Sequence, residues 1–293
     1  MNQRRRNDQR IFGVLLLAHE VIRGAPVPPI TLAAVMAQVA VFLEMVPMLS
    51  SHLTRKLCLL PSEIIRRKEW IRLFAPLVMH GDDMHLYYNM ASFIWKGRKL
   101  EPLLGPARYA ATLVALAISS SLFTVIISVL LDRSELFPHQ NFSSQCAVGF
   151  SGVIFALKVL CNAYTPEDVR LLGWFPVPSR YACWAELVLI QILTPNASFI
   201  GHLAGIVAGL FYTMGPLHWI IERLLGDGDP STRAWPNGDP STHAWPGEGR
   251  SFRNDRYTQY DYTGGLSEEE QIRRAMDESQ RHRNGPRYGW ITN

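Results

Sequence analysis

The sequence predicts an all-α, polytopic membrane protein: a bundle of six transmembrane helices followed by a largely disordered cytoplasmic tail. Two observations predict this. The 293 residues have a mean hydropathy of only +0.03, yet that average combines two unlike parts. Residues 1–221 hold 19 basic and 13 acidic residues, whereas the much shorter segment 222–293 holds 10 and 12. An apolar body with a densely charged extension is typical of a membrane domain joined to a soluble tail.

Composition also excludes two classes of protein. The net charge is only +4, and the basic residues punctuate apolar runs without forming a stripe, which disfavours a nucleic-acid binder. Four cysteines in the whole chain exclude a disulfide-rich scaffold. Residues 1–26 begin with a basic cluster and a short apolar run that His19 and Glu20 interrupt. Because no small-residue cleavage site follows, we interpret this segment as cytoplasmic or interfacial, not as a signal peptide.

Six apolar runs within residues 27–221 are the candidate spans of the membrane domain. Crossing about 30 Å of hydrocarbon takes about 20 apolar residues. A buried core in a soluble protein is the alternative, but six such runs leave little polar surface to cover it. The fifth run lies between Pro178 and Pro195 and is short for a full bilayer, so either the bilayer thins around it or the helix is loosely held, and a loosely held helix there would suit a lateral gate. The runs are residues 27–49, 84–104, 107–131, 146–163, 180–193 and 198–217.

Short loops set the predicted orientation. The loops after the second and fourth runs are basic, whereas residues 132–145 and 194–197 hold one basic residue between them, Arg133. Because basic loops stay cytoplasmic, we expect both termini in the cytoplasm. The segment 50–83 is also basic but falls on the far side, and we interpret it as short interfacial helices. The orienting residues are Lys96, Arg98, Lys99, Arg108, Lys158, Arg170 and Arg180.

Polar side chains recur near the start of three runs that share one direction. His85 and Asn89 open the second run, Ser151 lies early in the fourth, and His202 lies early in the sixth. We therefore expect all four at a similar depth, one or two turns below the far surface. An ionisable residue within a span is costly, which makes this layer the candidate functional site.

Small residues suggest how this layer comes together. Gly201, Gly205 and Gly209 form a small-residue stripe in the sixth run, and glycines 149 and 152 flank the serine in the fourth. Such stripes let helix backbones approach closely. If the two runs pack through these faces, Ser151 Oγ and the His202 ring come within hydrogen-bond reach.

A Ser–His pair at this depth indicates nucleophilic catalysis. The imidazole of His202 can take the Ser151 hydroxyl proton and later protonate the leaving amine. Candidate oxyanion donors are the Ser151 backbone N–H, the Asn89 amide and the His85 ring. No acidic residue shares the layer, which favours a dyad over a triad. A lone serine is more often a packing residue, and a lone histidine can simply bridge helices, but the joint arrangement favours catalysis. No cofactor or metal is expected, since the spacing of His80 and His85 does not match His-Glu-x-x-His.

Three motifs together resemble the rhomboid intramembrane serine proteases. They are Gly-Phe-Ser-Gly at 149–152, Gly-His-Leu-Ala-Gly-Ile-Val-Ala-Gly at 201–209, and His-Leu-Tyr-Tyr-Asn at 85–89. The resemblance covers about residues 30–217. It implies a nucleophilic Ser151, a basic His202, and His85, Asn89 and Gly149 at the oxyanion site. Trp-Ile-Arg at 70–72 resembles the family's Trp-Arg motif with one residue inserted.

The chain most resembles the endoplasmic-reticulum members of that family. That resemblance implies a multi-pass protein of the endoplasmic-reticulum membrane that cleaves unstable or polyubiquitinated membrane proteins during their degradation. The lipid bilayer and membrane-protein substrates are therefore expected partners. A non-catalytic, derlin-like adaptor that loosens ubiquitinated clients is the alternative, although an adaptor has no need of Ser151, His202 and Asn89 together.

The tail predicts a second binding function. Residues 222–263 form a Pro/Gly-rich linker with a two-copy repeat, Asp-Pro-Ser-Thr-x-Ala-Trp-Pro. Within residues 264–293, the stretch 266–280 opens with a capping box, which predicts a helix. Its acidic triplet, small alanine and serine resemble a ubiquitin-interacting motif, so ubiquitin or polyubiquitinated clients are expected partners. The predicted ubiquitin-binding residues are Glu268, Glu269, Glu270, Ile272, Ala275 and Ser279.

Several features stay open at this level. The endoplasmic-reticulum members are expected to end with an Arg-rich helix that binds a segregase ATPase, and residues 285–293 lack that run. Cys58 and Cys146 fall on the far side, where an oxidising lumen would let them bridge. Glycosylation sequons begin at Asn141 and Asn196, but both lie so close to a span that we favour unmodified asparagines. Glu186 in the fifth run could pair structurally or take part in catalysis, and pairing is favoured.

Overall fold

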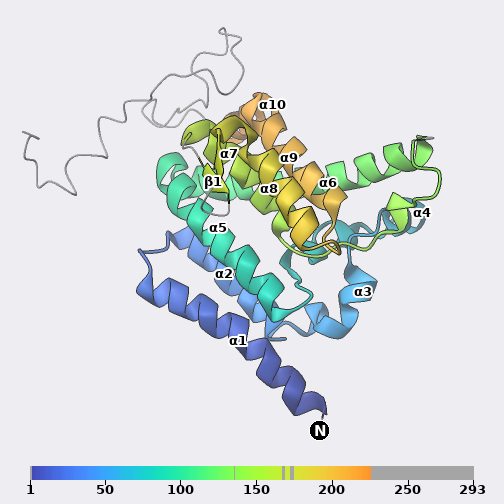
Figure 1. Ribbon diagram of the computed structural model, residues 1–293, viewed down its shortest axis with the longest axis horizontal. Coiled ribbons are helices and arrows are strands. Elements are labelled where there is room, and N and C mark those ends of the chain that lie inside the picture. Colours follow the sequence, from blue (N-terminus) through green and yellow to red (C-terminus); the bar gives the residue numbers. More distant parts are fainter. Residues whose placement is uncertain (1, 135, 167–168, 172–174, 226–293) are drawn as a thin grey trace, which may run out of the picture. The chain divides into compact units, whose positions relative to one another are not determined.

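The chain folds into a bundle of helices with one small sheet (Figure 1). The structure is a computed structural model that describes residues 2–134, 136–166, 169–171 and 175–225. The predictions for residues 226–293, which cover the ubiquitin-interacting motif and all of the linker 222–263 except its first four residues, lie outside these residues. The helices are α1 (Asn2–Arg23), α2 (Pro29–Phe42), α3 (Thr54–Leu57), α4 (Pro61–Arg67), α5 (Asp83–Leu104), α6 (Pro106–Arg133), α7 (Ser151–Tyr164), α8 (Ser179–Leu193), α9 (Phe199–Thr213) and α10 (Pro216–Leu225).

The predicted helical fold is confirmed, with one addition. Strands β1 (Val169–Leu171) and β2 (Phe175–Val177) form an antiparallel pair between α7 and α8, in which Arg170 lies opposite Pro176. Proline within β2 lacks a backbone N–H, which fits a strand with only one neighbour. The sequence analysis did not predict this hairpin.

Helix α7 lies at the centre of the bundle. It contacts α5, α6, α8 and α9, and its side chains from Val153 to Cys161 are all buried. A helix that meets other helices on every side is expected to be apolar all round, and Lys158 is the one charged residue of this stretch. Phe93 of α5 and Leu116 of α6 are fully buried against this core, together with Leu157 and Leu160. The centre of the bundle is therefore fixed by packing around the helix that begins with Ser151.

Only part of the predicted set of spans meets a length and hydropathy test for crossing a membrane. Among the described residues, α6 passes alone, and α9 with α10 passes if the two count as one broken span. Those two helices are bent by 62°, at Gly215 with its positive φ of 112° and at Pro216, which begins α10. The predicted count of six spans stays a prediction.

Helix boundaries differ from the expected ones for local reasons. The first predicted span, 27–49, is helical as α2 only to Phe42, and the chain then reverses at Glu44 with a φ of 61°. Between α2 and α5 the chain forms short helices and 3-10 turns, consistent in kind with the short helices expected for 50–83. These turns are Pro47–Leu49, Ser51–Leu53, Trp70–Leu73 and Ala75–Val78.

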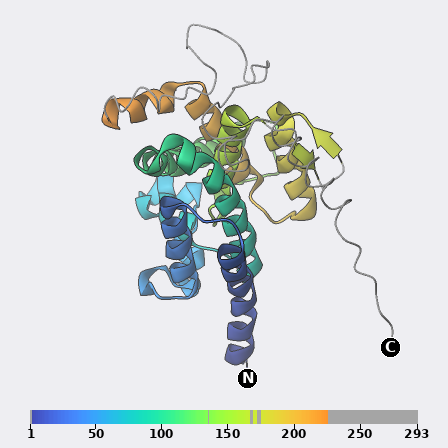
Figure 2. The same ribbon diagram turned by 90° about the vertical axis from the view of Figure 1, so that its left-hand side faces the viewer.

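The N-terminal segment is more structured than the sequence analysis expected. Residues within 1–26 form α1, a helix of 22 residues that lies alongside α5 (Figure 2). The Gly13 N–H donates to Asp83 at 3.2 Å, and Arg98 pairs with Glu20 at 3.3 Å. Leu17 is buried against the core. These contacts attach α1 to the helix that carries His85.

Candidate active site

Ser151 is the first residue of α7. The sequence analysis placed it about five residues into a span, but the segment 146–150 is not helical because Gly149 has a φ of 116°. Only glycine adopts such a conformation readily. The first N–H groups of a helix have no partner within the helix, so donors surround the serine at this end. The sharp turn at Gly149 therefore places the hydroxyl at a helix N-terminus.

His202 lies in the first turn of α9 and meets this serine. The Ser198 hydroxyl caps α9 by accepting from the Gly201 N–H at 3.1 Å. His202 Nε2 lies 2.9 Å from Ser151 Oγ, within hydrogen-bond distance. The imidazole is buried and stacks on the Phe155 ring, with centroids 4.7 Å apart. The expected contact between the Ser151 and His202 side chains is therefore present. Phe155, one turn after Ser151, packs against the His202 imidazole and orients it.

Close approach of α7 and α9 makes this contact possible. A Cβ added at Gly205 would collide with the backbone of Gly152, and one at Gly209 would lie 2.7 Å from the Ala156 carbonyl oxygen. The Gly201 carbonyl oxygen would be 3.1 Å from a Cβ at Gly152. Backbones this close require glycine, which is the purpose predicted for the small-residue stripe.

The second ring nitrogen of His202 has no hydrogen-bond partner among the residues that the structure describes. Within the described part of the chain, Nδ1 is buried and receives no donor or acceptor. The described geometry thus contains a Ser–His pair whose ring is oriented by stacking and by the position of α9, without a carboxylate at Nδ1.

His85 and Gly149 form the other side of the site. The Asp82 side chain accepts from the His85 N–H at 2.8 Å and so caps α5. A Cβ at Gly149 would lie 2.8 Å from His85 Nε2, so the imidazole rests directly beside this backbone. Asn89 is buried, and its Nδ2 donates to the His85 carbonyl oxygen at 2.8 Å. The structure therefore brings His85 and Gly149 together, whereas the Asn89 amide hydrogen bond is made within its own helix.

Covalent and backbone links fix the segment that leads to the serine. Cys58 and Cys146 form a disulfide with Cα atoms 5.5 Å apart, so the bridge that the sequence left open is present. Leu59 and Ala147 exchange two backbone hydrogen bonds next to it, and the Gly149 N–H donates to a carbonyl oxygen in the turn Ala75–Val78. The long segment before α5 thus anchors the turn at Gly149.

Arg72 supports the same link. Its guanidinium is buried, donates to the Cys58 carbonyl oxygen at 3.0 Å, and pairs with Glu69. Trp70, in contrast, is exposed. The Trp-Ile-Arg segment noted in the sequence is therefore a structural element of this loop, through its arginine.

Comparison with known proteins fits this geometry. The Rhomboid domain family model matches residues 67–218, which include all of these side chains except Cys58 and Leu59. This chain belongs to the rhomboid family. Rhomboid-related protein 4 of Homo sapiens is 40% identical and that of Mus musculus 43%. These alignments cover 91% and 94% of this chain and 86% and 89% of the relatives. Rhomboid-type serine protease 2 of Yarrowia lipolytica is 27% identical over 51% of this chain and 48% of its own length.

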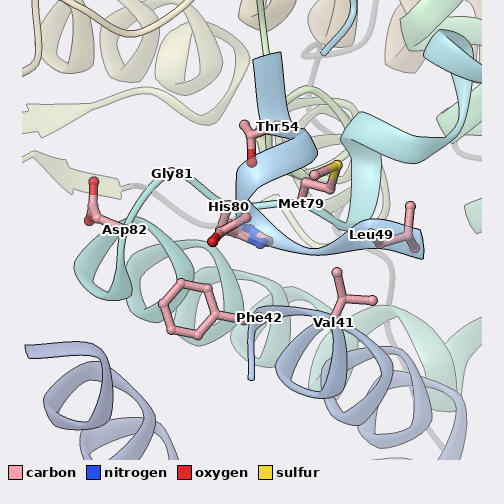
Figure 3. A pocket seen from close by; sticks show the side chains of 9 residues that line it. Val41, Phe42, Leu49, Thr54, Met79, His80, Gly81 and Asp82 are labelled. Carbon is pink, nitrogen blue, oxygen red and sulfur yellow. The ribbon is translucent and has the colours of Figure 1, made fainter. Parts of the chain in front are cut away.

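A small cavity adjoins this rhomboid site on the side of α2 (Figure 3). His80 lines it and is buried, with neither ring nitrogen hydrogen-bonded within the described residues. Burial and the nearby His85, whose ring centroid is 5.1 Å away, lower the pKa of His80 to about 3. A cavity of about 40 Å³ has room for water. The sequence analysis considered His80 only as a metal ligand, and so missed this neutral imidazole next to the site.

Glu186 of α8 is held in an ion pair. Its carboxylate pairs with Lys158 of α7 at 3.4 Å, which is the structural pairing that the sequence favoured over catalysis.

The glycosylation sequon at Asn141 lies in a short turn. Asn141 accepts a hydrogen bond from the Ser144 N–H and precedes the 3-10 turn Phe142–Ser144.

Proposed function

We propose that this rhomboid is an intramembrane serine protease in which Ser151 is the nucleophile and His202 the general base. The observation that carries the proposal is the 2.9 Å contact between Ser151 Oγ and His202 Nε2 in a buried setting. His202 takes the hydroxyl proton while Oγ bonds to the scissile carbonyl carbon. It then gives the proton to the departing amine, which leaves an acyl-serine ester. Water, deprotonated by the same ring, hydrolyses the ester and releases the second product.

The oxyanion needs donors on the opposite side of the scissile carbonyl. We assign this role to the Ser151 N–H, since it lies at the start of α7, and to the His85 imidazole, since it lies beside Gly149. Asn89 can contribute after its side chain leaves the His85 carbonyl oxygen. This rearrangement belongs to the substrate complex, where catalytic hydrogen bonds commonly tighten.

A tagged single-pass client reconstituted with the purified full chain tests the proposal. We expect Ser151→Ala and His202→Ala each to lower cleavage by on the order of 10³-fold or more. Ser128→Ala, which changes a buried serine of α6, is the matched control and should cleave normally. A fluorophosphonate probe should label wild type but not Ser151→Ala. If the client fragment persists with Ser151→Ala, the dyad assignment is wrong and the adaptor alternative gains support.

We further propose that the clients are unstable or ubiquitinated membrane proteins of the endoplasmic reticulum, cleaved within or near their spans for degradation. The disulfide between Cys58 and Cys146 supports an oxidising compartment on the dyad side of the membrane. The ubiquitin-interacting pattern in the tail supports capture of modified clients, and the basic loops support cytoplasmic termini. Accessibility of terminal tags after selective permeabilisation of the plasma membrane tests the orientation.

The tail is tested separately from the dyad. Ala275→Gln and Ser279→Ala should each reduce capture of polyubiquitin by the full chain, because the small alanine permits close approach of ubiquitin. Ser231→Ala in the linker repeat is the control. Unchanged capture by both tail variants would refute ubiquitin binding at this motif. A segregase ATPase is a further candidate partner. Because residues 285–293 lack the expected Arg-rich run, co-purification with the full chain has to test this binding.

A further inference from the structure

A second polar layer lies deeper in the bundle than the dyad. It is formed by Lys96 of α5, Lys158 of α7 and Glu186 of α8. Only 3% of Lys96 and 5% of Lys158 is exposed. Charged side chains buried within a membrane domain are costly, and they commonly mark a binding site or a pathway. The mechanism proposed above uses none of these three groups.

The layer holds more positive than negative charge. Lys158 Nζ pairs with Glu186 at 3.4 Å, and Glu186 is also the carboxylate that acts electrostatically on Lys96. Lys96 Nζ itself donates to the neutral Ser92 hydroxyl at 2.7 Å. Both ammonium groups lie over the Trp95 ring, 5.5 and 5.6 Å from its centroid, and the less buried Lys99 ammonium lies over it at 4.4 Å. Lys96 and Lys158 thus share one carboxylate, and a second carboxylate beside them would offset the cost of burying both ammonium groups.

The layer can be reached from the side of α8. The Glu186 side chain is 26% exposed, and Trp95 and Trp184 are exposed as well. Of the α8 side chains, only Ala182, Cys183 and Leu187 are buried. This sparse packing fits the alternative of a loosely held helix, beside which a client helix would enter.

The depth of the layer can be related to the cleavage position. Lys158 follows Ser151 by seven residues on α7, which is about 10 Å along a helix. A client helix that enters beside α8 and runs parallel to α7 would bring the residue about seven positions from its scissile bond to the level of Lys158. A long lysine side chain adapts to a residue or two in either direction.

We propose that Lys96, Lys158 and Glu186 form a specificity site for client membrane helices that carry Asp or Glu about seven residues to the cytoplasmic side of the scissile bond. This rests on the proposed proteolytic function. The client carboxylate would supply the missing anion and form charge-assisted hydrogen bonds with the lysines. A client lysine at the same position would meet the surplus positive charge and bind poorly.

A series of client helices tests the proposal with the full chain in liposomes. The clients are identical except for Leu, Asn, Asp or Lys at the seventh position, plus one helix with Asp at the third position as the register control. We expect kcat/KM for Asp at the seventh position to exceed that for Leu by on the order of tenfold, with Lys below Leu. The third-position Asp should give no such gain.

Variants of the enzyme identify the groups responsible. Lys96→Met and Lys158→Met should remove the preference for Asp while the Leu client is still cleaved, and Glu186→Gln should increase the preference. Labelling of Ser151 by a fluorophosphonate shows that each variant is folded, and where one is not, the client series on wild type decides. Equal cleavage of all clients, abolished by Ser151→Ala, would overturn the specificity site and leave the protease intact. Cleavage of no client would instead count against the proposed function.

Discussion

Substituting Gly205 by alanine should disable the dyad without touching either of its residues. A Cβ at this position would lie 2.8 Å from the Gly152 carbonyl carbon and 3.0 Å from its Cα. The same Cβ would overlap the Gly152 carbonyl oxygen, and ordinary van der Waals contact begins near 3.4 Å, so α7 and α9 would have to separate by about 1 Å. Gly152 adjoins Ser151, and Gly205 lies one turn after His202. The 2.9 Å contact would therefore lengthen beyond good hydrogen-bond distance.

The expected size of the effect follows from this displacement. Overpacking a close helix contact costs about 1–3 kcal/mol of folding free energy. A misplacement of about 1 Å lowers catalysis by about 10²-fold, so Gly205→Ala should cost on the order of 10²-fold in kcat. Client cleavage in liposomes gives kcat, and thermal unfolding of the purified chain in detergent gives the stability.

Gly201→Ala is the matched control from the same stripe. A Cβ there meets only the Ser198 side chain, at 3.1 Å for Oγ, which can turn aside at the cost of the helix cap. We expect a much smaller loss of kcat than for Gly205→Ala. Equal losses in the two variants, or normal cleavage by Gly205→Ala, would show that backbone spacing does not set the dyad geometry.

Three further predictions follow from contacts around the site. Phe155→Leu should lower kcat by about three- to tenfold in a client assay, because an aromatic stack of about 0.5–1.5 kcal/mol on the His202 ring is lost. Replacing Cys58 by serine should cost about 4–5 kcal/mol, since the disulfide closes a loop across 88 residues, and Cys146→Ser should cost the same in thermal unfolding with no added effect in the double variant. The pKa of His80 is near 3 when folded and near 6.5 when unfolded, so folding stability should fall as the pH drops below about 6.5, and His80→Gln should weaken that fall between pH 7 and 5.

The meeting of Ser151 with His202 could be predicted because it depends on periodic features. Glycines at intervals of four residues mark one helix face, and runs in the same direction bring their starts to one level. Both regularities can be recognised in the sequence without knowledge of the fold. The structure shows both, with Gly205 against Gly152 and the two side chains 2.9 Å apart.

Other features depend on single backbone conformations or on partners distant in the sequence. The late start of α7 follows from the φ of Gly149, which the sequence permits but does not demand. The packing of α1 depends on Asp83 and Arg98, 70 and 78 residues beyond their partners. Phe155 stacks on His202 only because α7 and α9 pack against each other. In the sequence, an aromatic residue at this position is indistinguishable from an ordinary core residue. None of these leaves a periodic signal.

The packing around His202 also bears on how a Ser–His pair can work without a third residue. In a triad, a carboxylate at the second ring nitrogen fixes the tautomer and stabilises the imidazolium. Within the described residues His202 Nδ1 has no partner, and the ring is held by Phe155 and by the glycine contacts of α9. Packing can fix the orientation of the ring, but it stabilises its positive charge little. The proposed reaction would then rely more on the oxyanion donors at the start of α7 and on His85. For that reason we expect the spacing of α7 and α9 to control kcat more strongly than substrate binding.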